Sequence, residues 1–391
     1  MTAIRRARVG DIARLRREPV AVDPLAAYRE IGVRSFGKGI FHKEPVTGAD
    51  LAEKRVFEIH PGDLVLNNVF AWEGAVALAT ELERGMIGSH RFMTYVPDTG
   101  ESIANYLRYF FLCEQGLDLL RRASPGSAGR NRTLNISAFE SLEIPLPDLE
   151  EQRRIAAKLD RLLSTTQAAV NLVSRAGDLA APLFDGLATR IMSRADRRIL
   201  LAEVAEINPA PDPVSATELI SFVPMAAVDD VTGTITAAQT KLRGEVNPGY
   251  KQFRRGDVIF ARITPCMQNG KSAVASMATA WGYGSTEFHV IRPGPSVLSE
   301  WIHGVVRTSA FRDDAQKGLT GTAGQQRVPA DFLREVSIPV PESVDHQRSL
   351  LVDVDRVLDS GRRTKDLLDS QYARLKALGA SVLNQAFNGG L

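Results

Sequence analysis

The chain has 391 residues, enough for two hydrophobic cores, so two domains are expected. Hydrophobic residues make up 44% and charged residues 24% of the sequence, as in ordinary soluble globular proteins. The formal net charge of +2 excludes a strong overall field that would attract nucleic acid. The two cysteines, Cys113 and Cys266, lie far apart in the sequence, which excludes a disulfide framework and a thiolate zinc site.

The N-terminal segment is basic but has no apolar core of the length that a signal peptide needs. Residues 1–40 contain nine Arg or Lys and four Asp or Glu, a local charge of +5. No run of about 18 apolar residues occurs in the sequence. These features predict a cytoplasmic protein without a membrane partner. Arginines outnumber lysines by 38 to 10, which fits bidentate contacts to phosphate and guanine or, equally, codon bias in a GC-rich genome.

In chain order, residues 1–147 are expected to form a mixed domain of short strands and one helical passage. A β-branched run, GDLVLNNV, begins at Gly62, and the helical passage covers residues 102–123. Residues 148–196 follow as one long helix. Residues 197–341 are predicted as a second mixed domain, with the run GDVIFARI at Gly256 and a helical passage over 296–315, and residues 342–391 as a second long helix.

Four sequence anchors occur twice, in the same order and 194 to 196 residues apart. They are the two β-branched runs, then GSHRF and GSTEF, then GSAGRNR and GTAGQQR, and finally IPLPDLEEQRR and IPVPESVDHQR. A period of half the chain indicates a duplicated domain and not a solenoid of short repeats.

Each predicted long helix carries apolar or small residues at alternating spacings of three and four. Each pattern covers about 40 residues, or roughly 60 Å of unbroken helix. Neither helix can bury such a stripe alone, so the two are expected to pair and to hold the mixed domains apart. The alternative is that each helix packs only on its own domain. Gly361 and Gln371 are expected to weaken the seam of the second helix.

We find no catalytic motif in the sequence. QNGKS at 268–272 ends like a P-loop, but Pro265 stands where that loop needs its first glycine. The six histidines are not paired at metal spacing, and no GxSxG turn is present. None of the ten lysines follows an acidic residue by two positions, as the D/E-x-K pair of many nucleases requires. The sequence therefore predicts a non-catalytic chain with no catalytic residue, metal site or cofactor of its own.

The third anchor suggests what two such domains could read. Arg pairs with guanine, and Asn or Gln pairs with adenine, through the edges of the bases. The loop scaffold repeats while its polar residues differ, as expected of two domains of one fold with different targets; a solvated polar loop is the alternative for any single residue. The candidate DNA-binding residues are Asn67, Asn68, Trp72, His90, Arg91, Arg130, Asn131 and Arg132 in the first half, and Arg262, Gln268, Lys271, Gln325, Gln326 and Arg327 in the second.

The whole chain resembles the specificity subunit of a type I restriction–modification system. The passages GDLVLNNVFAWEGAVA…GMIGSHRF and GDVIFARITPCMQNGKSAVA…GYGSTEF resemble that family's target-recognition domains. IPLPDLEEQRRIAAKLD and IPVPESVDHQRSLLVDVD resemble the entry to its conserved helices, and the closing VLNQAFNGGL resembles the end of its last helix.

The resemblance implies an α+β fold with two target-recognition domains, separated by two long antiparallel, coiled-coil-like helices in a pseudo-twofold arrangement. Each domain would read one half of a split, asymmetric site in double-stranded DNA. Two modification subunits, which bind S-adenosylmethionine and methylate adenine, would dock on the helices; restriction subunits would use ATP and Mg²⁺ to translocate and cut DNA. The expected docking residues are Gln152, Ile155, Leu159, Leu162, Gln347, Leu350, Val354 and Val357.

The second junction departs from the family's pattern, because Val-Asp-His-Gln replaces Leu-Glu-Glu-Gln there. Unequal docking of the two modification subunits is therefore expected. The low net charge predicts that the chain alone binds DNA weakly and with a steep dependence on salt. Two other hypotheses stay open: an orphan scaffold or regulatory paralogue that binds modification subunits without directing methylation, and an enzyme with an unfamiliar site.

Overall fold

The computed structural model describes residues 5–51, 54–126, 132–321 and 325–388. The chain divides into two compact units. Unit 1 comprises Met1–Val173 and Ser370–Leu391, and unit 2 comprises Ser174–Asp369. Each unit contains a mixed domain and parts of two long helices, so the predicted fold class is confirmed.

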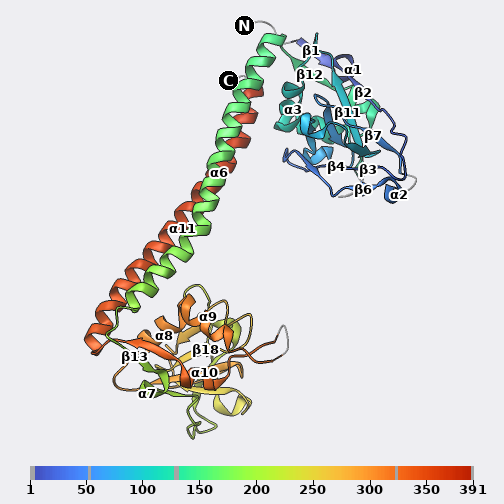
Figure 1. Ribbon diagram of the computed structural model, residues 1–391. Helices are drawn as coiled ribbons and strands as arrows, with labels where there is room; N and C mark the ends of the chain where they lie inside the picture. The colour runs from blue at the N-terminus through green and yellow to red at the C-terminus, as the bar shows by residue number, and fades with distance from the viewer. Residues whose placement is uncertain (1–4, 52–53, 127–131, 322–324, 389–391) are drawn as a thin grey trace. The chain divides into compact units, whose positions relative to one another are not determined.

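A four-stranded antiparallel sheet forms the centre of unit 1 (Figure 1). Its order is β2 (Ala13–Arg16), β11 (Phe92–Pro97), β8 (Leu64–Asn67) and β9 (Val76–Leu78). Helices α3 (Ala104–Leu112), α4 (Glu114–Arg122) and α5 (Ile136–Glu140) contribute to the core beside this sheet. Tyr95 of β11 lies 5.0 Å from Phe139 of α5, and both rings are fully buried.

Short strand pairs complete unit 1. β1 (Arg5–Arg8) pairs with β12 (Glu143–Leu146), and β7 (Val56–Glu58) with β10 (Ile87–Ser89). β3 (Ala27–Tyr28) pairs with β6 (Val46–Thr47), and between them in the chain β4 (Ile31–Val33) and β5 (Ile40–His42) form a hairpin. The remaining short elements are α1 (Val9–Ile12), α2 (Gly48–Leu51), η1 (Ala71–Glu73) and η2 (Glu81–Glu83).

Unit 2 repeats the central sheet with β14 (Ala205–Ile207), β21 (Phe288–Pro293), β18 (Val258–Ala261) and β19 (Ser272–Val274) in the same order. A second sheet has the order β16 (Gln239–Leu242), β15 (Leu219–Val223), β20 (Trp281–Gly284) and β17 (Lys251–Arg254). β13 (Arg197–Leu200) pairs with β22 (Ser337–Val340). The short helices are α7 (Leu201–Val204), α8 (Ser299–Arg307), α9 (Ser309–Lys317), α10 (Ala330–Glu335), η3 (Met225–Ala227) and η4 (Arg243–Glu245).

The single helical passage expected in each half is broken into two helices. In unit 1 the break lies at Cys113, which is extended (φ −76°, ψ 165°). A Cβ on Gly116 would lie 1.9 Å from the carbonyl oxygen of Phe110, so glycine permits the sharp turn between α3 and α4. In unit 2 the break lies at Thr308, whose hydroxyl caps α9 by accepting a hydrogen bond from the Phe311 amide. Hydrophobic periodicity does not reveal such a break, because the apolar face continues through it.

The two long helices are α6 (Leu149–Met192) and α11 (Val344–Phe387), each of 44 residues. Within unit 1 the first half of α6 lies beside the last part of α11 (Figure 1). Ile155 and Leu159 share the hydrophobic core with Ala386. The ring of Phe387 lies 5.4 Å from that of Tyr106 and 5.5 Å from that of Phe110.

Within unit 2 the last part of α6 lies beside the first part of α11, so the helices are antiparallel. Gly361 was expected to weaken this seam. A Cβ there would lie within 3.1 Å of three atoms of Phe184, so glycine makes room for that ring. The missing side chain therefore permits close packing. At the end of α6, Met192 belongs to the core of unit 2 together with Leu350 and Val354.

Candidate nucleic-acid interface

The candidate residues cluster at the end of one central strand in each unit. In unit 1 the strand is β8, and the amide of Asn68 beyond it donates to the Arg91 carbonyl at 2.8 Å. The Asn68 carbonyl accepts from the Leu134 amide at 2.8 Å. In unit 2 the Arg262 amide donates to the Glu287 carbonyl at 2.9 Å, and the Arg262 carbonyl accepts from Val328 at 2.8 Å.

These bonds give both units the same backbone junction of three segments. A strand end, the turn before β11 or β21, and the segment after the small-residue loop meet there. Position by position, unit 1 places Asn68, Arg91 and Arg132 where unit 2 places Arg262, Glu287 and Arg327. The backbone is therefore repeated, while the charged groups that it presents are different.

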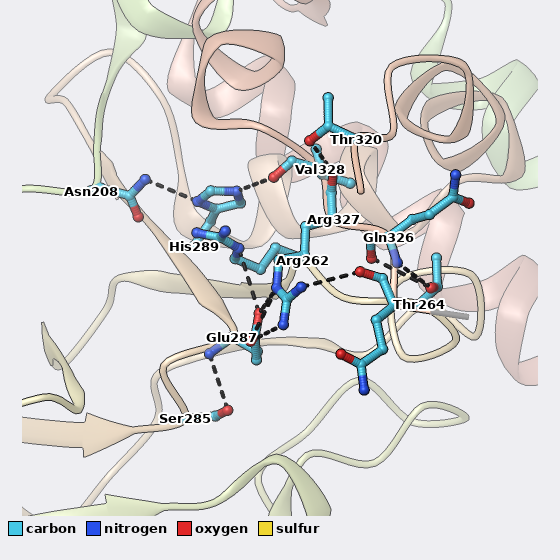
Figure 2. Close-up of polar contacts among 11 residues, drawn as sticks. Asn208, Arg262, Thr264, Ser285, Glu287, His289, Thr320, Gln326, Arg327 and Val328 are labelled. Carbon is cyan, nitrogen blue, oxygen red and sulfur yellow. Dashed lines mark hydrogen bonds and ion pairs between the residues drawn. The ribbon is translucent and has the colours of Figure 1, made fainter. Parts of the chain in front are cut away.

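In unit 2 the carboxylate of Glu287 holds both arginines (Figure 2). Arg327 donates to it from Nε at 2.9 and 3.1 Å and from Nη2 at 2.8 Å. Arg262 forms a longer ion pair with it, 3.6 Å from Nε to oxygen. The hydrogen bonds from Arg327 lower the pKa of Glu287, which keeps the carboxylate charged. The cluster carries a net charge of +1 and is half-buried.

A buried histidine, His289, contacts the backbone next to Arg327. Nε2 of His289 lies 2.8 Å from the carbonyl oxygen of Val328, and Nδ1 lies 2.9 Å from the side-chain nitrogen Nδ2 of Asn208 (Figure 2). Burial lowers the pKa of His289 to about 4. The ring is therefore neutral at pH 7, with its proton on Nε2 for the bond to Val328 and with Nδ1 as acceptor.

The three candidate glutamines of unit 2 have side-chain amides that are available for contacts. The backbone of Gln326 exchanges bonds with Thr264, from the Thr264 amide to the Gln326 carbonyl at 3.0 Å and from the Gln326 amide to the Thr264 hydroxyl at 3.2 Å. Gln325 is exposed, as is Gln268, whose carbonyl accepts from Arg312. Among the described residues, no hydrogen bond holds the side-chain amide of any of these three glutamines. Their predicted contacts with bases stay predictions.

Lys271 has a different position from the one expected of a phosphate contact. Its ammonium group donates to the carbonyls of Val228 at 2.9 Å and Met225 at 3.4 Å. The side chain is half-buried and joins β19 to the η3 segment. We therefore assign Lys271 a structural role, because a lysine already bound to two carbonyls has little capacity left for DNA.

Unit 1 presents its candidates without a carboxylate. Arg91 and His90 are exposed, and no described residue forms an ion pair with Arg91. The guanidinium of Arg132 lies 5.3 Å from the ring of Trp72, whose indole N–H donates to the Val69 carbonyl at 3.0 Å. Asn67 caps the same turn by accepting from the Val69 amide at 3.1 Å.

Asn68 also has an unusual environment, because its side-chain oxygen is buried without a hydrogen-bond partner in the described part of the chain. Arg130 and Asn131, the other two candidates of this loop, lie outside the described residues. The described candidates of unit 1 thus include Arg91 and Arg132 but no carboxylate, whereas those of unit 2 enclose a carboxylate.

Comparison with known protein families gives this interface a context. Residues 47–171 match the family model of the type I restriction modification DNA specificity domain. The matched residues include β8, the Arg91 turn and the first part of α6, so they cover the junction of unit 1.

Two curated relatives from Escherichia coli are similar to part of the chain. The type I restriction enzyme EcoEI specificity subunit is 35% identical over 152 residues, and the EcoAI specificity subunit is 33% identical over 153 residues. These matches cover 38% and 39% of this chain. They span 26% of each relative, about a quarter of its length.

Two solved structures resemble the whole chain. The HsdS subunit from Thermoanaerobacter tengcongensis has a TM-score of 0.65 at 21% identity, over 100% of this chain and 98% of that one. A chain from a study of complex assembly and conformational transition of the type I R-M system has a TM-score of 0.75 at 20% identity, over 100% and 99%. At this identity they show the fold. Together with the specificity domain, they confirm the resemblance stated from the sequence.

Most of the residues expected to dock a partner on the long helices are buried within their own units. Gln152 and Gln347 are 0% exposed. Gln152 accepts from the Ile103 amide at 3.0 Å and donates to the carbonyls of Glu101 at 3.0 Å and Pro147 at 2.8 Å. Gln347 accepts from the Leu298 amide and donates to the Ser296 carbonyl, both at 2.8 Å.

The repeated glutamine therefore fastens each long helix to the loop before α3 or α8, which explains why the junction phrase occurs twice. Ile155, Leu159, Leu350 and Val354 are also buried in the cores of their units. These six side chains already contact the chain itself, and docking of a partner through them stays a prediction. Leu162, which is 36% exposed, and the half-buried Val357 remain accessible.

The sequence reasoning missed two features of the site. Glu287 was overlooked, although the paired anchors GSHRF and GSTEF differ in charge at that position. A concave groove in unit 1, about 540 Å³ in volume, was also missed. It includes Asn67 and Arg91 and extends over the β4–β5 hairpin, whose basic and aromatic residues no motif singled out.

A group of possible metal ligands occurs elsewhere in the described part of unit 1. One ligand atom each of Glu18, Glu58 and His60 lies within 4.8 Å of the others. His60 is 3.0 Å from Glu18, which also pairs with Arg16 at 3.7 Å. Because Glu18 already has two basic neighbours, the arrangement is explained without a metal. Separately, no helix within the described ranges is both long and apolar enough to cross a membrane.

Proposed function

We propose that this chain is the DNA-binding specificity subunit of a type I restriction–modification complex, in which each unit reads one half of a split, asymmetric site. The observation that carries the proposal is the repeated backbone junction with different polar and charged residues, Asn68, Arg91 and Arg132 against Arg262, Glu287 and Arg327. Arginine reads guanine, asparagine reads adenine, and glutamate accepts from cytosine. Two junctions of this composition would select two different half-sites.

The chain performs no chemistry in this proposal. Two modification subunits, carrying S-adenosylmethionine, would methylate adenine at the site that the units select. Restriction subunits would cut DNA with ATP and Mg²⁺, and the complex would act in the cytoplasm. The antiparallel pairing of α6 and α11 supports the role of the helices as a spacer between half-sites.

The exposed faces of the long helices are the proposed docking surface for the modification subunits. Leu179 and Leu183 of α6 are 68% and 59% exposed, and Leu367 of α11 is 60% exposed. Leucines this exposed on a long helix favour a protein partner. They replace the buried residues as the docking candidates, together with Leu162.

The test is to co-express the chain with the modification subunit encoded beside it in a host without DNA methylation, and to map N6-methyladenine by sequencing. A split, asymmetric motif that disappears without this chain supports the proposal. Unmethylated DNA from a complex shown to be assembled contradicts it and favours an orphan scaffold. Leu179→Asp should weaken assembly, whereas Ser174→Asp, at an exposed position on another face of the same helix, adds the same single negative charge and is the matched control.

A further inference from the structure

The groove of unit 1 is formed by the tip of the β4–β5 hairpin and the turns that follow β8 and β10. Its basic residues are Arg34, Lys38, Lys43 and Arg91, and no carboxylate lines it. Lys43 pairs with Glu30 at 3.3 Å, but no described residue forms an ion pair with the other three. A volume of about 540 Å³ lies within the usual range for small-molecule sites.

The hairpin tip holds a phenylalanine in an unfavourable position. Phe36 is 73% exposed, and its φ of 60° lies in the left-handed region that residues with large side chains rarely adopt. The backbone is fixed there, because the amides of Phe36 and Gly37 donate to the carbonyls of Glu73 at 2.8 Å and Gly74 at 2.9 Å. Burial gains nothing from this arrangement, so it indicates a contact with another molecule.

Two aromatic rings of the groove each have a cation beside them. Lys38 lies 5.9 Å from the centre of the Phe36 ring, and Arg34 lies 4.8 Å from that of Phe41. A second aromatic residue of the groove, Phe70, is 40% exposed. Accessible aromatic faces between unpaired cations are the combination that binds a base by stacking and its phosphates by charge.

Unit 2 has an equivalent hairpin without this chemistry. The strand before each tip pairs in parallel with β10 or β20, through Glu30 and Ile87 in unit 1 and through β15 in unit 2. Each tip has six residues, 34–39 between Val33 and Ile40, and 229–234 between Val228 and Ile235. The third residue is Phe36 in unit 1 and Val231, 70% exposed, in unit 2.

The charges at the two tips are opposite. The first tip carries Arg34 and Lys38 and no acidic residue, whereas the second carries Asp229 and Asp230 and no basic residue. Beneath the second tip, Arg307 of α8 donates to the carbonyls of Asp230 at 3.0 Å and Val231 at 2.8 Å. Leu112 lies beneath the first tip, within 2.9 Å of a Cβ built on Gly37. The second tip thus has a cation of its own, whereas the cations of the first remain available for an anion.

We propose that this groove is a nucleotide subsite of unit 1, in which Phe36 stacks on an unstacked base of the DNA half-site while Arg34, Lys38 and Arg91 bind the adjoining phosphates. The proposal rests on the proposed function of unit 1 in reading DNA. Unit 2 has no such subsite among its described residues. Unstacking would therefore be confined to one half of the split site.

The test places a fluorescent side chain at each tip of the full chain. Phe36→Trp and, as matched control, Val231→Trp are titrated at low ionic strength with a duplex that carries the methylated motif. Phe36→Ala and Val231→Ala are compared by fluorescence anisotropy. Both positions are largely exposed, so the fold should tolerate these changes, and circular dichroism verifies this.

We expect quenching of the tryptophan at position 36 but not at position 231, and an approximately tenfold loss of affinity for Phe36→Ala alone. If the duplex binds but Phe36→Ala and Phe36→Trp respond as the control variants do, the subsite is wrong while DNA binding stands. If neither the wild-type chain nor any variant binds the duplex, both the subsite and the proposed function are wrong. If free AMP quenches the tryptophan at position 36 and the duplex does not, the groove binds a free nucleotide and the proposed DNA subsite is wrong.

Discussion

The two units present different charges from one backbone junction. Where unit 1 has Arg91, open to solvent and without an ion-pair partner among the described residues, unit 2 has Glu287 bound to Arg262 and Arg327. The residue before the equivalent strands β8 and β18 is an aspartate in both units. Asp63 of unit 1 lies 3.4 Å from Arg16 of β2, whereas Asp257 of unit 2 accepts two hydrogen bonds from Arg292 of β21. The duplicated fold has thus kept its hydrogen-bonded frame and exchanged the charges placed on it.

The comparison separates the residues that form the shared frame from those in which the two units differ. Gln152 and Gln347 make equivalent bonds, and so do the backbone amides of Asn68 and Arg262. The side chains beyond that frame differ, and at one position, Arg91 against Glu287, they differ in the sign of their charge. Predictions that act on the frame should therefore affect both units alike, and predictions that act on the charges should separate them.

The largest effect is expected in the two cores. Leu159→Asp places a carboxylate at a position that is 0% exposed, at a cost of about 4 kcal/mol or more in the free energy of unfolding. Hydrogen exchange should show loss of protection in unit 1. Val354→Asp should do the same in unit 2. Leu162→Asp, at a 36% exposed position of α6, is the control and should change protection little. Equal loss in both units for either core variant would contradict the division into units.

The pH should affect the units in opposite directions. Burial lowers the pKa of His289 and of His303 in unit 2 to about 4 each. The unfolded chain binds these protons more readily, so the stabilisation is present above pH 6.5 and is lost as the pH falls toward 4. Each histidine contributes up to about 3 kcal/mol. In unit 1, burial raises the pKa of Asp63 to about 6, so its contribution is present below pH 3.8 and is lost as the pH rises through 6.

Hydrogen exchange at pH 4.5 and 7.5 measures both effects. We expect unit 2 to lose protection at the lower pH. His289→Gln should reduce this loss, and Asp63→Asn should remove the opposing change in unit 1. A parallel response of the two units would show that these buried groups do not govern the pH dependence.

The glutamine at each junction should matter equally. Gln152→Leu leaves the Ile103 amide and the Glu101 carbonyl without partners, which should cost about 2 kcal/mol. Gln347→Leu should cost a similar amount in unit 2. Thermal unfolding of both variants checks this, with Gln167→Leu, on the exposed face of α6, as the control. If both variants unfold at the same temperature as the wild-type chain, the hydrogen bonds of the two glutamines do not explain why the residue is repeated.

The smallest effects are expected from single charges at the junctions. Glu287→Gln frees Arg262 and Arg327 for phosphates, so DNA affinity at low salt should rise about tenfold and the salt dependence should steepen. Arg91→Glu should lower the affinity by a similar factor. Anisotropy with one duplex over a series of salt concentrations measures both. Changes of the same sign would contradict the placement of both Arg91 and Glu287 at the surface that meets DNA.

Much of the fold could be predicted from the sequence, because a duplicated chain states each element twice. The anchors at Gly62 and Gly256 predicted equivalent strands, and the spacing of apolar residues predicted α6 and α11. The boundary of each domain along the chain remains a prediction, because the compact units divide both long helices.

What the sequence could not predict depends on contacts between distant residues. Gly361 looks like a defect until Phe184 is found against it. Lys271 reads as a phosphate contact until its ammonium is found on two carbonyls. Glu287 and Arg327 are 40 residues apart, and only the fold brings them to hydrogen-bonding distance. Sequence motifs locate a candidate loop. Whether its charged side chains are free to contact DNA depends on the residues that bind them in the fold.

The most direct test of independent reading by the two units is the methylation motif of single variants. Arg91→Glu and Glu287→Gln would each be co-expressed with the modification subunit, and N6-methyladenine would be mapped against the wild-type motif. We expect each variant to alter or weaken one half of the motif, a different half in the two cases, with the spacing between halves unchanged. A change in both halves from one variant, or in the same half from both, would contradict the assignment of one half-site to each unit.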